Sequence, residues 1–321
     1  MQRSHMPDSG MPRGRQLRLL ALLAAIVFVA AACGSDDDDS LDGETPPDGG
    51  SGVEVTSALF QAAQTGGITI GIAEEPPFGF TDPDTGDANG EAPIVARAVL
   101  AQLGITDVSA EAVDFGALIN GLAAGQYDIV AAGMFINEER ASQALFTDPD
   151  YCVLQGLAVP DGNPDDLNSF ADVAANSDVT LGVLGGAVEE GFALDAGVPD
   201  GQLSRFDAVS DMVDALTSGR IDSYALTAIS VTEQTAELDG FEASEPFAIE
   251  GILNCGGYVF RVDDQDARDE FNAVLVAMRD GGDLAPLLTD FPIFEDSGSL
   301  AAAQGVSVMD IIGMPYDFAI S

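Results

Sequence analysis

The sequence predicts an α/β protein of two lobes, each built on a mostly parallel sheet flanked by helices. At 321 residues the chain is long enough for about two domains. From residue 68 onward, short apolar runs alternate with helix-like stretches in two successive sets. Because 46% of the residues are apolar, the chain can build real cores and is not wholly disordered.

The first set of elements is expected to alternate strands and helices. The strands fall at 68–73, 108–113 and 127–132, and the helices at 91–103 and 117–124. Asn137 then caps a short helix that runs to Gln143. A helix between successive strands favours parallel pairing.

The second set follows an extended segment at 151–160. Its expected helices lie at 169–175, 188–194, 208–218 and 229–238, and its strands at 179–184, 202–206 and 221–226. Another extended segment at 256–262 and a long helix at 264–279 come last. The apolar stretch at 306–314 is a further candidate helix, which would pack on the first lobe.

Composition excludes several kinds of chemistry. The chain has 54 acidic and 11 basic residues, and its net charge of −43 repels phosphate backbones, which argues against nucleic-acid binding. All the basic residues are Arg, so a P-loop, a Schiff base and a Ser-Lys dyad are excluded. The single His is His5, in the predicted leader. The mature chain would then have neither a His-based catalytic triad nor a His-ligated metal, and we expect no cofactor.

The N-terminus is typical of an exported protein. A basic segment that ends at Arg18 precedes a 14-residue apolar run at 19–32, which is too short to span a bilayer. Small residues before Cys33 are similar to a lipobox, although Ala30 stands where Leu is usual. We therefore expect residues 1–32 to be a signal peptide and Cys33 to be lipidated. The alternative is ordinary cleavage that leaves a free Cys. The acidic segment 33–67 is interpreted as a linker to a lipid anchor on the outer face of the cytoplasmic membrane.

Three groups of motifs carry a family resemblance. Residues 70–80 read Ile-Gly-Ile-Ala-Glu-Glu-Pro-Pro-Phe-Gly-Phe. The second group lies at 114–122 and 125–129, and the third at 132–140 and 146–151. With these motifs, the region 68–291 resembles a type II periplasmic solute-binding protein of an ABC importer.

The resemblance implies two lobes joined by two hinge strands, with the ligand bound in the cleft between them. Lobe 1 would comprise 68–155 and 254–321, and lobe 2 would comprise 156–253. The partners would be a small zwitterionic solute and the membrane permease of the importer, with the receptor itself a monomer. The crossings would fall near 151–156 and 252–257, which brings Cys152 and Cys255 side by side. In an oxidising compartment the two would form a disulfide, the alternative being two separate buried thiols.

Within this family, the chain most resembles the ectoine- and hydroxyectoine-binding proteins. The residues that carry this are Glu75-Pro-Pro-Phe78, Gly90-Glu-Ala-Pro93 and Ala225-Leu-Thr-Ala228. Two alternatives stay open: a receptor for an amino acid or another zwitterion, and a carboxylate-dependent dehydratase of cyclic acids with the same fold. A sensor domain fused to a membrane protein is disfavoured, because no second apolar span follows the first.

The resemblance assigns a role to each candidate site residue. Arg140 would hold the ligand carboxylate through its planar guanidinium. Glu75, or its neighbour Glu74, would accept hydrogen bonds from a cyclic amidinium. Aromatic faces would attract the same cation; they belong to Phe78, Phe115 and Phe135. The competing roles are a structural ion pair for Arg140, a solvated acid for Glu75 and plain core packing for the aromatic residues.

Two departures from the family pattern concern lobe 2. Thr227 stands where amino-acid receptors usually carry an Asp that pairs with the α-ammonium, so a ligand without a free ammonium fits better. The alternative is that Thr227 bonds only to backbone. Gly186 and Ala187 open a helix whose N–H groups are suited to a carboxylate, but Ala187 replaces the usual Thr.

Overall fold

The computed structural model describes residues 53–313. The predicted signal peptide, Cys33 and most of the predicted linker lie outside the described residues. None of the helices between residues 53 and 313 is long and apolar enough to cross a membrane.

Lobe 1 is built on a six-stranded mixed sheet. Its strand order is β4 (Val108–Ala112), β1 (Ile68–Ile72), β5 (Ile129–Phe135), β13 (Cys255–Phe260) and β6 (Leu145–Phe146), with β7 (Tyr151–Cys152) also paired to β13. Strand β1 runs parallel to β4 and β5, whereas β13 runs antiparallel to all its neighbours. A small hairpin of β2 (Phe80–Thr81) and β3 (Ala88–Asn89) follows β1.

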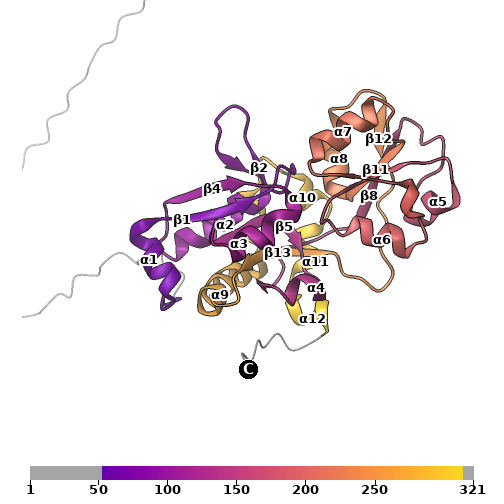
Figure 1. The fold of residues 1–321 in the computed structure, drawn as a ribbon. Helices are drawn as coiled ribbons and strands as arrows, with labels where there is room; N and C mark the ends of the chain where they lie inside the picture. Colours follow the sequence, from indigo (N-terminus) through magenta and orange to yellow (C-terminus); the bar gives the residue numbers. More distant parts are fainter. Residues whose placement is uncertain (1–52, 314–321) are drawn as a thin grey trace, which may run out of the picture. The chain divides into compact units, whose positions relative to one another are not determined.

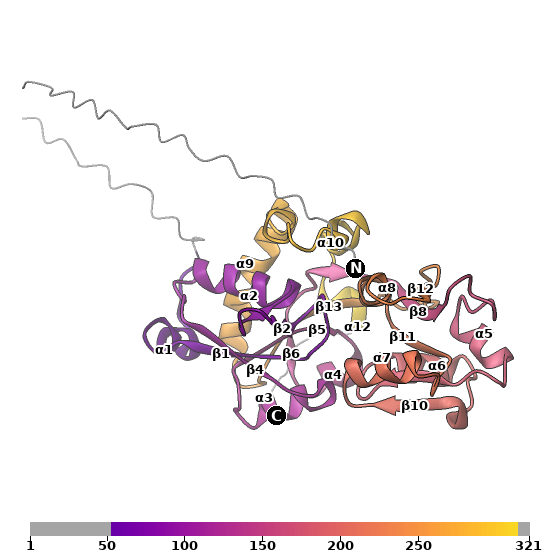
Figure 2. The ribbon, with the colours of Figure 1, turned by 90° about the horizontal axis from the view of Figure 1, so that it is seen from above.

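Helices cover both faces of this sheet. One face carries α1 (Ala58–Gly66), α2 (Glu91–Gln102) and α9 (Gln265–Gly281), and the other carries α3 (Leu118–Ala123), as Figures 1 and 2 show. Helix α9 ends where Gly282 takes the left-handed conformation, for which glycine carries no steric penalty. The short helix α4 (Glu138–Ala141) follows β5, and Asn137 caps it as predicted by accepting a hydrogen bond from the Arg140 N–H.

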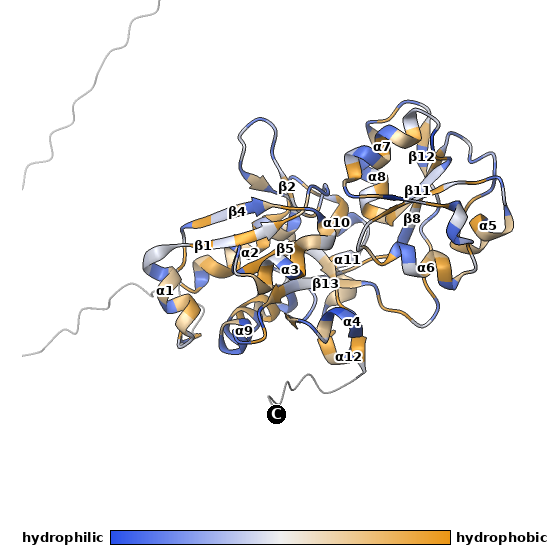
Figure 3. Ribbon diagram, viewed as in Figure 1, coloured by the Kyte–Doolittle hydropathy of each residue, from blue (hydrophilic) through white to orange (hydrophobic). Residues whose placement is uncertain are grey.

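Lobe 2 has a five-stranded mixed sheet. The order is β10 (Leu203–Phe206), β9 (Leu181–Leu184), β11 (Ser223–Thr227), β8 (Gln155–Pro160) and β12 (Phe241–Ala243). Helices α5 (Phe170–Ala175) and α6 (Glu189–Asp195) pack on one face, and α7 (Val209–Thr217) and α8 (Ala228–Ala236) on the other. Polar stretches lie in the connections, such as the loop between β2 and β3, which is blue in Figure 3.

The α/β two-lobe architecture is confirmed, and each predicted strand and helix has a counterpart. The expectation of mostly parallel sheets is wrong, because both sheets are mixed. Strand β8 enters lobe 2 antiparallel to β11 and β12, and β13 returns to lobe 1 antiparallel to β5. The strand next to each crossing is therefore antiparallel to its neighbours, whereas alternating strands and helices favour parallel pairing.

The predicted linker ends too late in the chain. Residues 58–66 form α1, whose Phe60 is fully buried and meets the Phe260 ring edge-on at 6.2 Å. The Glu270 carboxylate accepts hydrogen bonds from the Thr56 and Ser57 backbone N–H groups. The segment from about residue 55 to residue 67 is thus part of lobe 1, because it covers an apolar edge of its core.

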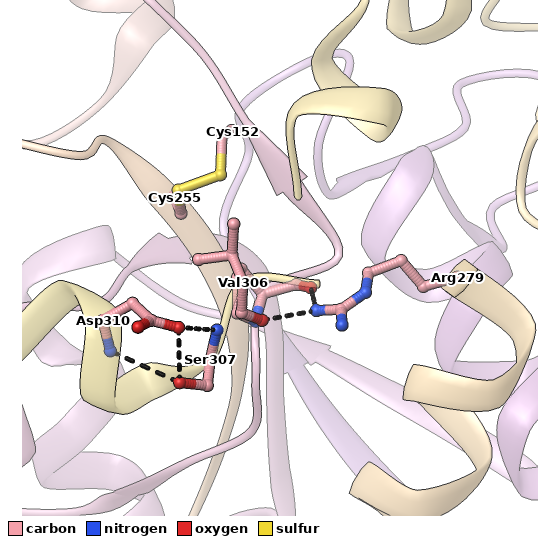
Figure 4. The surroundings of a disulfide bond; sticks show 7 residues. Cys152, Cys255, Arg279, Val306, Ser307 and Asp310 are labelled. Carbon is pink, nitrogen blue, oxygen red and sulfur yellow. Dashed lines mark hydrogen bonds between the residues drawn. A yellow bond between two sulfur atoms is a disulfide. The ribbon is translucent and has the colours of Figure 1, made fainter. Parts of the chain in front are cut away.

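The C-terminal residues also return to lobe 1. They form α10 (Ile293–Asp296), α11 (Ser299–Ala303) and α12 (Val308–Ile312). Phe294 is buried, and the Arg279 guanidinium donates to the Val306 carbonyl at 2.8 Å. A reciprocal cap between Ser307 and Asp310 starts α12 (Figure 4).

The strands on either side of the crossing are joined covalently. Cys152 on β7 and Cys255 on β13 face each other in register, with their Cα atoms 4.0 Å apart, and form a disulfide (Figure 4). The bond closes a loop with a sequence separation of 103 that contains all of lobe 2.

Two carboxyl groups are buried together beside this crossing. Glu91 opens α2 and Asp150 precedes β7, and both are almost fully buried. Among the described residues, neither carboxyl makes a hydrogen bond of ordinary geometry, although the Tyr258 hydroxyl lies near Asp150. The two carboxyls interact with each other, and a hydrogen bond between them needs a proton. Burial, and then the negative charge of Asp150, raise the pKa of Glu91 well above its ordinary 4.5. Burial likewise raises the pKa of Asp150.

Replacing both cysteines by Ala should lower the free energy of unfolding by about 2–4 kcal/mol, since a closed loop restricts the unfolded chain. Urea denaturation of Cys152→Ala/Cys255→Ala against the parent measures this. Thiols counted on denatured, unreduced protein that lacks Cys33 provide the control. Two free thiols in the parent, or equal urea midpoints, would contradict the role of the bond.

The carboxyl pair should make stability depend on pH. The folded chain keeps the Glu91 proton above pH 4.5, whereas the unfolded chain releases it. This contribution is therefore complete at low pH and is lost as pH rises, by up to about 1.4 kcal/mol per pH unit for one proton. Over about pH 6 to 9, Glu91→Gln should flatten the pH dependence of the unfolding free energy, because an amide donates to Asp150 at any pH. Glu233→Gln, at an exposed site on α8, is the matched control; equal slopes in parent and Glu91→Gln would count against a shared proton.

Candidate functional site

Most of the sequence-predicted site residues line one cavity. This small cavity lies between the two lobes. Lobe 1 contributes the loop after β1, the turn before α3, strand β5 and helix α4. Lobe 2 contributes the start of α6 and the end of β11. The lining residues are Glu75, Phe115, Gly133, Phe135, Arg140, Ala187, Val188, Glu189, Leu226 and Thr227.

Arg140 is the only cation in this lining. Its Nη1 donates to the Phe135 carbonyl of lobe 1 and its Nη2 to the Gly186 carbonyl of lobe 2, both at 2.8 Å. The guanidinium also lies 5.4 Å from the centre of the Phe115 ring, within cation–π range. Arg140 takes part in none of the ion pairs among the described residues. Two of its five N–H donors are used by these bonds, so three are left for a ligand.

Glu75 lines the lobe 1 side of the cavity and is 7% exposed. Ser230, in the first turn of α8, donates its hydroxyl to Glu75 Oε1 at 3.0 Å. Burial and the nearby Glu189 raise the pKa of Glu75 to about 8, while Ser230 and Arg140 act in the opposite direction. Glu74, the alternative, is exposed and accepts two hydrogen bonds from Thr81, which fixes the β2 hairpin.

Glu189 is a site residue that the sequence did not reveal. It is 3% exposed at the first turn of α6. With its amide turned so that both ends meet suitable partners, Gln155 donates to Glu189 Oε1 at 2.9 Å. Burial raises the pKa of Glu189 to about 7, against the effects of its own backbone N–H and of Arg140. In the sequence, nothing distinguishes it from Glu190, which is half exposed and pairs with Arg205.

The three predicted aromatic residues are divided between cavity and core. Phe115 and Phe135 line the cavity. Phe78 is 1% exposed and packs on Tyr151, with ring centres 4.8 Å apart, and edge-on against Phe294. The structure thus places Phe78 in the layer behind the cavity, among the aromatic residues that support the hinge.

Thr227 lines the cavity and also caps α8. Its hydroxyl accepts a hydrogen bond from the Ser230 backbone N–H at 3.0 Å, and it approaches the Ser230 hydroxyl at 3.2 Å. Ser230 therefore connects Thr227 to Glu75, a link that the sequence did not suggest.

Gly186 and Ala187 meet Arg140 in an unexpected way. The Gly186 carbonyl, rather than its N–H, points to the guanidinium. The Ala187 N–H is used inside the turn, where it donates to the Leu184 carbonyl at 3.1 Å. What this turn offers Arg140 is therefore an acceptor.

The arrangement suits a small molecule with charges of both signs. Arg140 presents free donors to a carboxylate, while Glu75 and Glu189 present buried acceptors to a cation. Phe115 and Phe135 supply apolar and aromatic surface beside them. Among residues 53–313, no three His, Cys, Asp or Glu side chains are grouped to hold a metal ion.

The family model of bacterial extracellular solute-binding proteins, family 3, matches residues 68–291. The chain is 32% identical over 246 residues to the probable amino-acid ABC transporter periplasmic-binding protein y4tE of Sinorhizobium fredii, with 74% of this chain and 81% of that protein covered. It is 25% identical over 273 residues to the arginine-binding extracellular protein ArtP of Bacillus subtilis, with 84% and 94% covered.

Among solved structures, EhuB in complex with hydroxyectoine is similar, with a TM-score of 0.69 and 34% sequence identity. The match covers 78% of this chain and 96% of that chain. These relatives are solute-binding proteins and not enzymes.

Proposed function

The chain belongs to the bacterial extracellular solute-binding proteins of family 3, and from this membership we propose that it is the receptor of an ABC importer for ectoine or hydroxyectoine. The single observation that carries the choice of ligand is the set of charges in the cavity: one guanidinium with free donors, opposed by two buried carboxylates. The 34% identity to EhuB supports the same choice.

Arg140 anchors the carboxylate of the ligand in this proposal. Its guanidinium is already oriented by Phe135 and Gly186, so few degrees of freedom are lost on binding. Because burial excludes water from the guanidinium, a charged hydrogen bond formed there is stronger than one at the surface.

Glu75 and the two aromatic rings of the cavity take the ring of the ligand. A cyclic amidinium spreads its charge over a flat face, which matches Phe115 and Phe135. Its N–H groups match the carboxylate of Glu75. Thr227 adds a hydroxyl but no charge, so a compact ammonium at that place would lack a counter-ion. Phe78 supports this wall from behind through Tyr151.

The remaining parts of the proposal concern location. The predicted signal peptide and the lipid on Cys33 would place the protein outside the cytoplasmic membrane, tethered beside its permease. Lobe closure around the solute would then present the complex to that permease as a monomer.

An amino acid is the second candidate ligand. The relative from Sinorhizobium fredii is described as a probable amino-acid receptor, and ArtP as an arginine-binding protein. Glu75 and Glu189 offer carboxylates that an α-ammonium or a guanidinium would need. An amino-acid receptor is expected to carry a carboxylate at position 227, where this chain has Thr227. A receptor for ectoine does not need one there.

Arg140→Ala should remove most of the affinity for ectoine. Losing a charged partner in a desolvated cavity costs at least about 2–4 kcal/mol, or about 30- to 1000-fold in affinity. Calorimetric titration in high salt measures this, with Arg220→Ala, at an exposed site, as the control. Arg140→Lys keeps the charge if the Ala variant does not fold. Unchanged affinity in the Ala variant would show that Arg140 is not the anchor.

The panel of ligands should separate the two candidates. We expect ectoine or hydroxyectoine to bind more tightly than glycine betaine, arginine, glutamine or glutamate in competition calorimetry. Thr227 gives an α-ammonium placed beside it no counter-ion, and Glu75 and Glu189 accept hydrogen bonds from the N–H groups of a flat cyclic cation, which glycine betaine lacks. Thr227→Asp should raise the affinity for amino acids relative to ectoine. It should also preserve the N-cap of α8, because Asp caps helices as well as Thr does. Micromolar binding of a standard amino acid, with ectoine silent, would overturn the choice of ligand and leave the receptor function in place.

A further inference from the structure

We infer that Glu189 and Glu75 form a clamp between the lobes that holds the cationic group of the ligand and gives up a proton when that cation binds. The inference rests on the proposed receptor function and adds a residue from lobe 2 to the cation-binding side. It also makes proton release part of ligand binding.

The two carboxylates belong to different lobes. Glu75 lies in the loop that follows β1, and Glu189 in the first turn of α6. Both line the same cavity and both are at least nine-tenths buried. The charge of Glu189 contributes to the raised pKa of Glu75, so the two carboxylates are close enough to repel each other. A cation between them would replace that repulsion with two attractions across the cleft.

Each carboxylate has unused capacity for hydrogen bonds. Glu75 accepts from the Ser230 hydroxyl, and Glu189 from the Gln155 amide and its own backbone N–H. A carboxylate has about four acceptor sites, so more remain than are used. Neither takes part in an ion pair among the described residues.

The charges of the ligand-free cavity favour a retained proton. With pKa values of about 8 for Glu75 and about 7 for Glu189, the pair holds between one and two protons at about pH 7 and about one near pH 7.5. One guanidinium, Arg140, offsets the remaining charge. The other ionisable side chains that face this cavity, the two adjoining pockets or Arg140 are Glu74, Asp114, Glu139, Tyr151, Glu190, Asp195 and Asp207.

Binding of a zwitterion then proceeds as an exchange. The ligand carboxylate goes to Arg140, and the ligand N–H groups donate to both carboxylates. The proton that Glu75 and Glu189 shared leaves to solvent, and no covalent bond of the ligand changes. Since the cation competes with this proton, affinity should fall as pH is lowered through the pKa values of the pair.

A single carboxylate on the cation-binding side would behave differently. Burial, the largest cause, would still raise the pKa of Glu75 without Glu189, but the added effect of the Glu189 charge would be gone. Glu189→Gln is therefore expected to lower both the affinity and the number of protons released. A purely structural role for Glu189, such as support of α6, would change stability and leave proton release unaltered.

Calorimetric titration with ectoine at about pH 6, 7, 8 and 9 tests the exchange, with two buffers of different ionisation enthalpy at each pH. The difference between buffers counts the protons released. We expect release of about one to one and a half protons near pH 7, and an affinity that rises by about ten- to a hundredfold per pH unit below pH 7, the limits for one and for two protons. Glu189→Gln should lose at least about tenfold in affinity and release fewer protons than the parent, because only Glu75 is left to give one up.

Glu190→Gln is the matched control, because it removes the adjacent carboxylate, which pairs with Arg205 and lines the adjoining pocket but not the cavity itself. It should bind ectoine and release protons as the parent does. Ectoine binding without proton release, or equal behaviour of the Glu189→Gln and Glu190→Gln variants, would overturn the clamp and leave the receptor function standing.

A measurement without ligand separates failure of the clamp from failure of the proposed function. Ionising buried Glu189 destabilises the folded chain as pH rises, so the stability of Glu189→Gln relative to the parent should increase between about pH 5 and pH 8 and level off above that. Parallel pH dependences in ligand-free parent and variant would overturn the clamp even if ectoine binds. The ligand-free result could be as expected while no zwitterion binds at any pH. That outcome would contradict the receptor function but would still support a proton shared by Glu75 and Glu189.

Discussion

The buried guanidinium of Arg140 is the interaction on which the rest of the site depends. Taking a charge out of water is costly, so each atom around it has to offer compensation. One carbonyl from each lobe accepts its hydrogen bonds, and the Phe115 ring faces it. The contact with Gly186 requires the lobe backbones to approach closely. A Cβ on Gly186 would lie 2.6 Å from the Gly116 Cα, and its φ of +79° suits glycine.

Negative charge is distributed around this guanidinium in two buried pairs. Glu75 and Glu189 line the cavity, and Glu91 and Asp150 lie behind it. Burial, and then the charges of Glu91, Asp150 and Glu75, raise the pKa of Tyr151, so this one side chain interacts with both pairs. Most of the other acids are at the surface, where water and salt screen them. An acidic side chain at the surface is thus a solvated charge, whereas burial raises the pKa of Glu75, Glu189, Glu91 and Asp150.

The parts of the fold that follow from periodicity could be predicted from the sequence, and those that follow from contacts could not. Apolar runs separated by helical stretches placed β1, β9 and α9. The mixed sheets depend on which way β8 and β13 run, which no local pattern records. Helix α1 was assigned to the linker because an acidic, Gly-rich segment precedes it, although its Phe60 is buried.

The same division applies to the site. Arg140 lies in a motif whose order along the chain carries its role, whereas Glu189 shares a helix turn with an ordinary surface acid. Phe78 and Phe115 are alike in sequence context, yet Phe78 packs against the rings of Tyr151 and Phe294 rather than lining the cavity. Whether an aromatic side chain faces a ligand or the core depends on the layer behind it, and residues 293–303 supply much of that layer.

The distinctive feature of this cavity is where its negative charge is placed, which is at the loop after β1 and at α6 and not at position 227. A carboxylate at position 227 would extend from the end of β11, but Thr227 there is occupied with the cap of α8. The carboxylates come instead from the loop after β1 and from α6, on opposite lobes. A cation attracted by both must lie between the lobes, so its binding favours closure as well as selecting the ligand. In the proposed receptor, recognition of charge and movement of the lobes would therefore be driven by the same contacts.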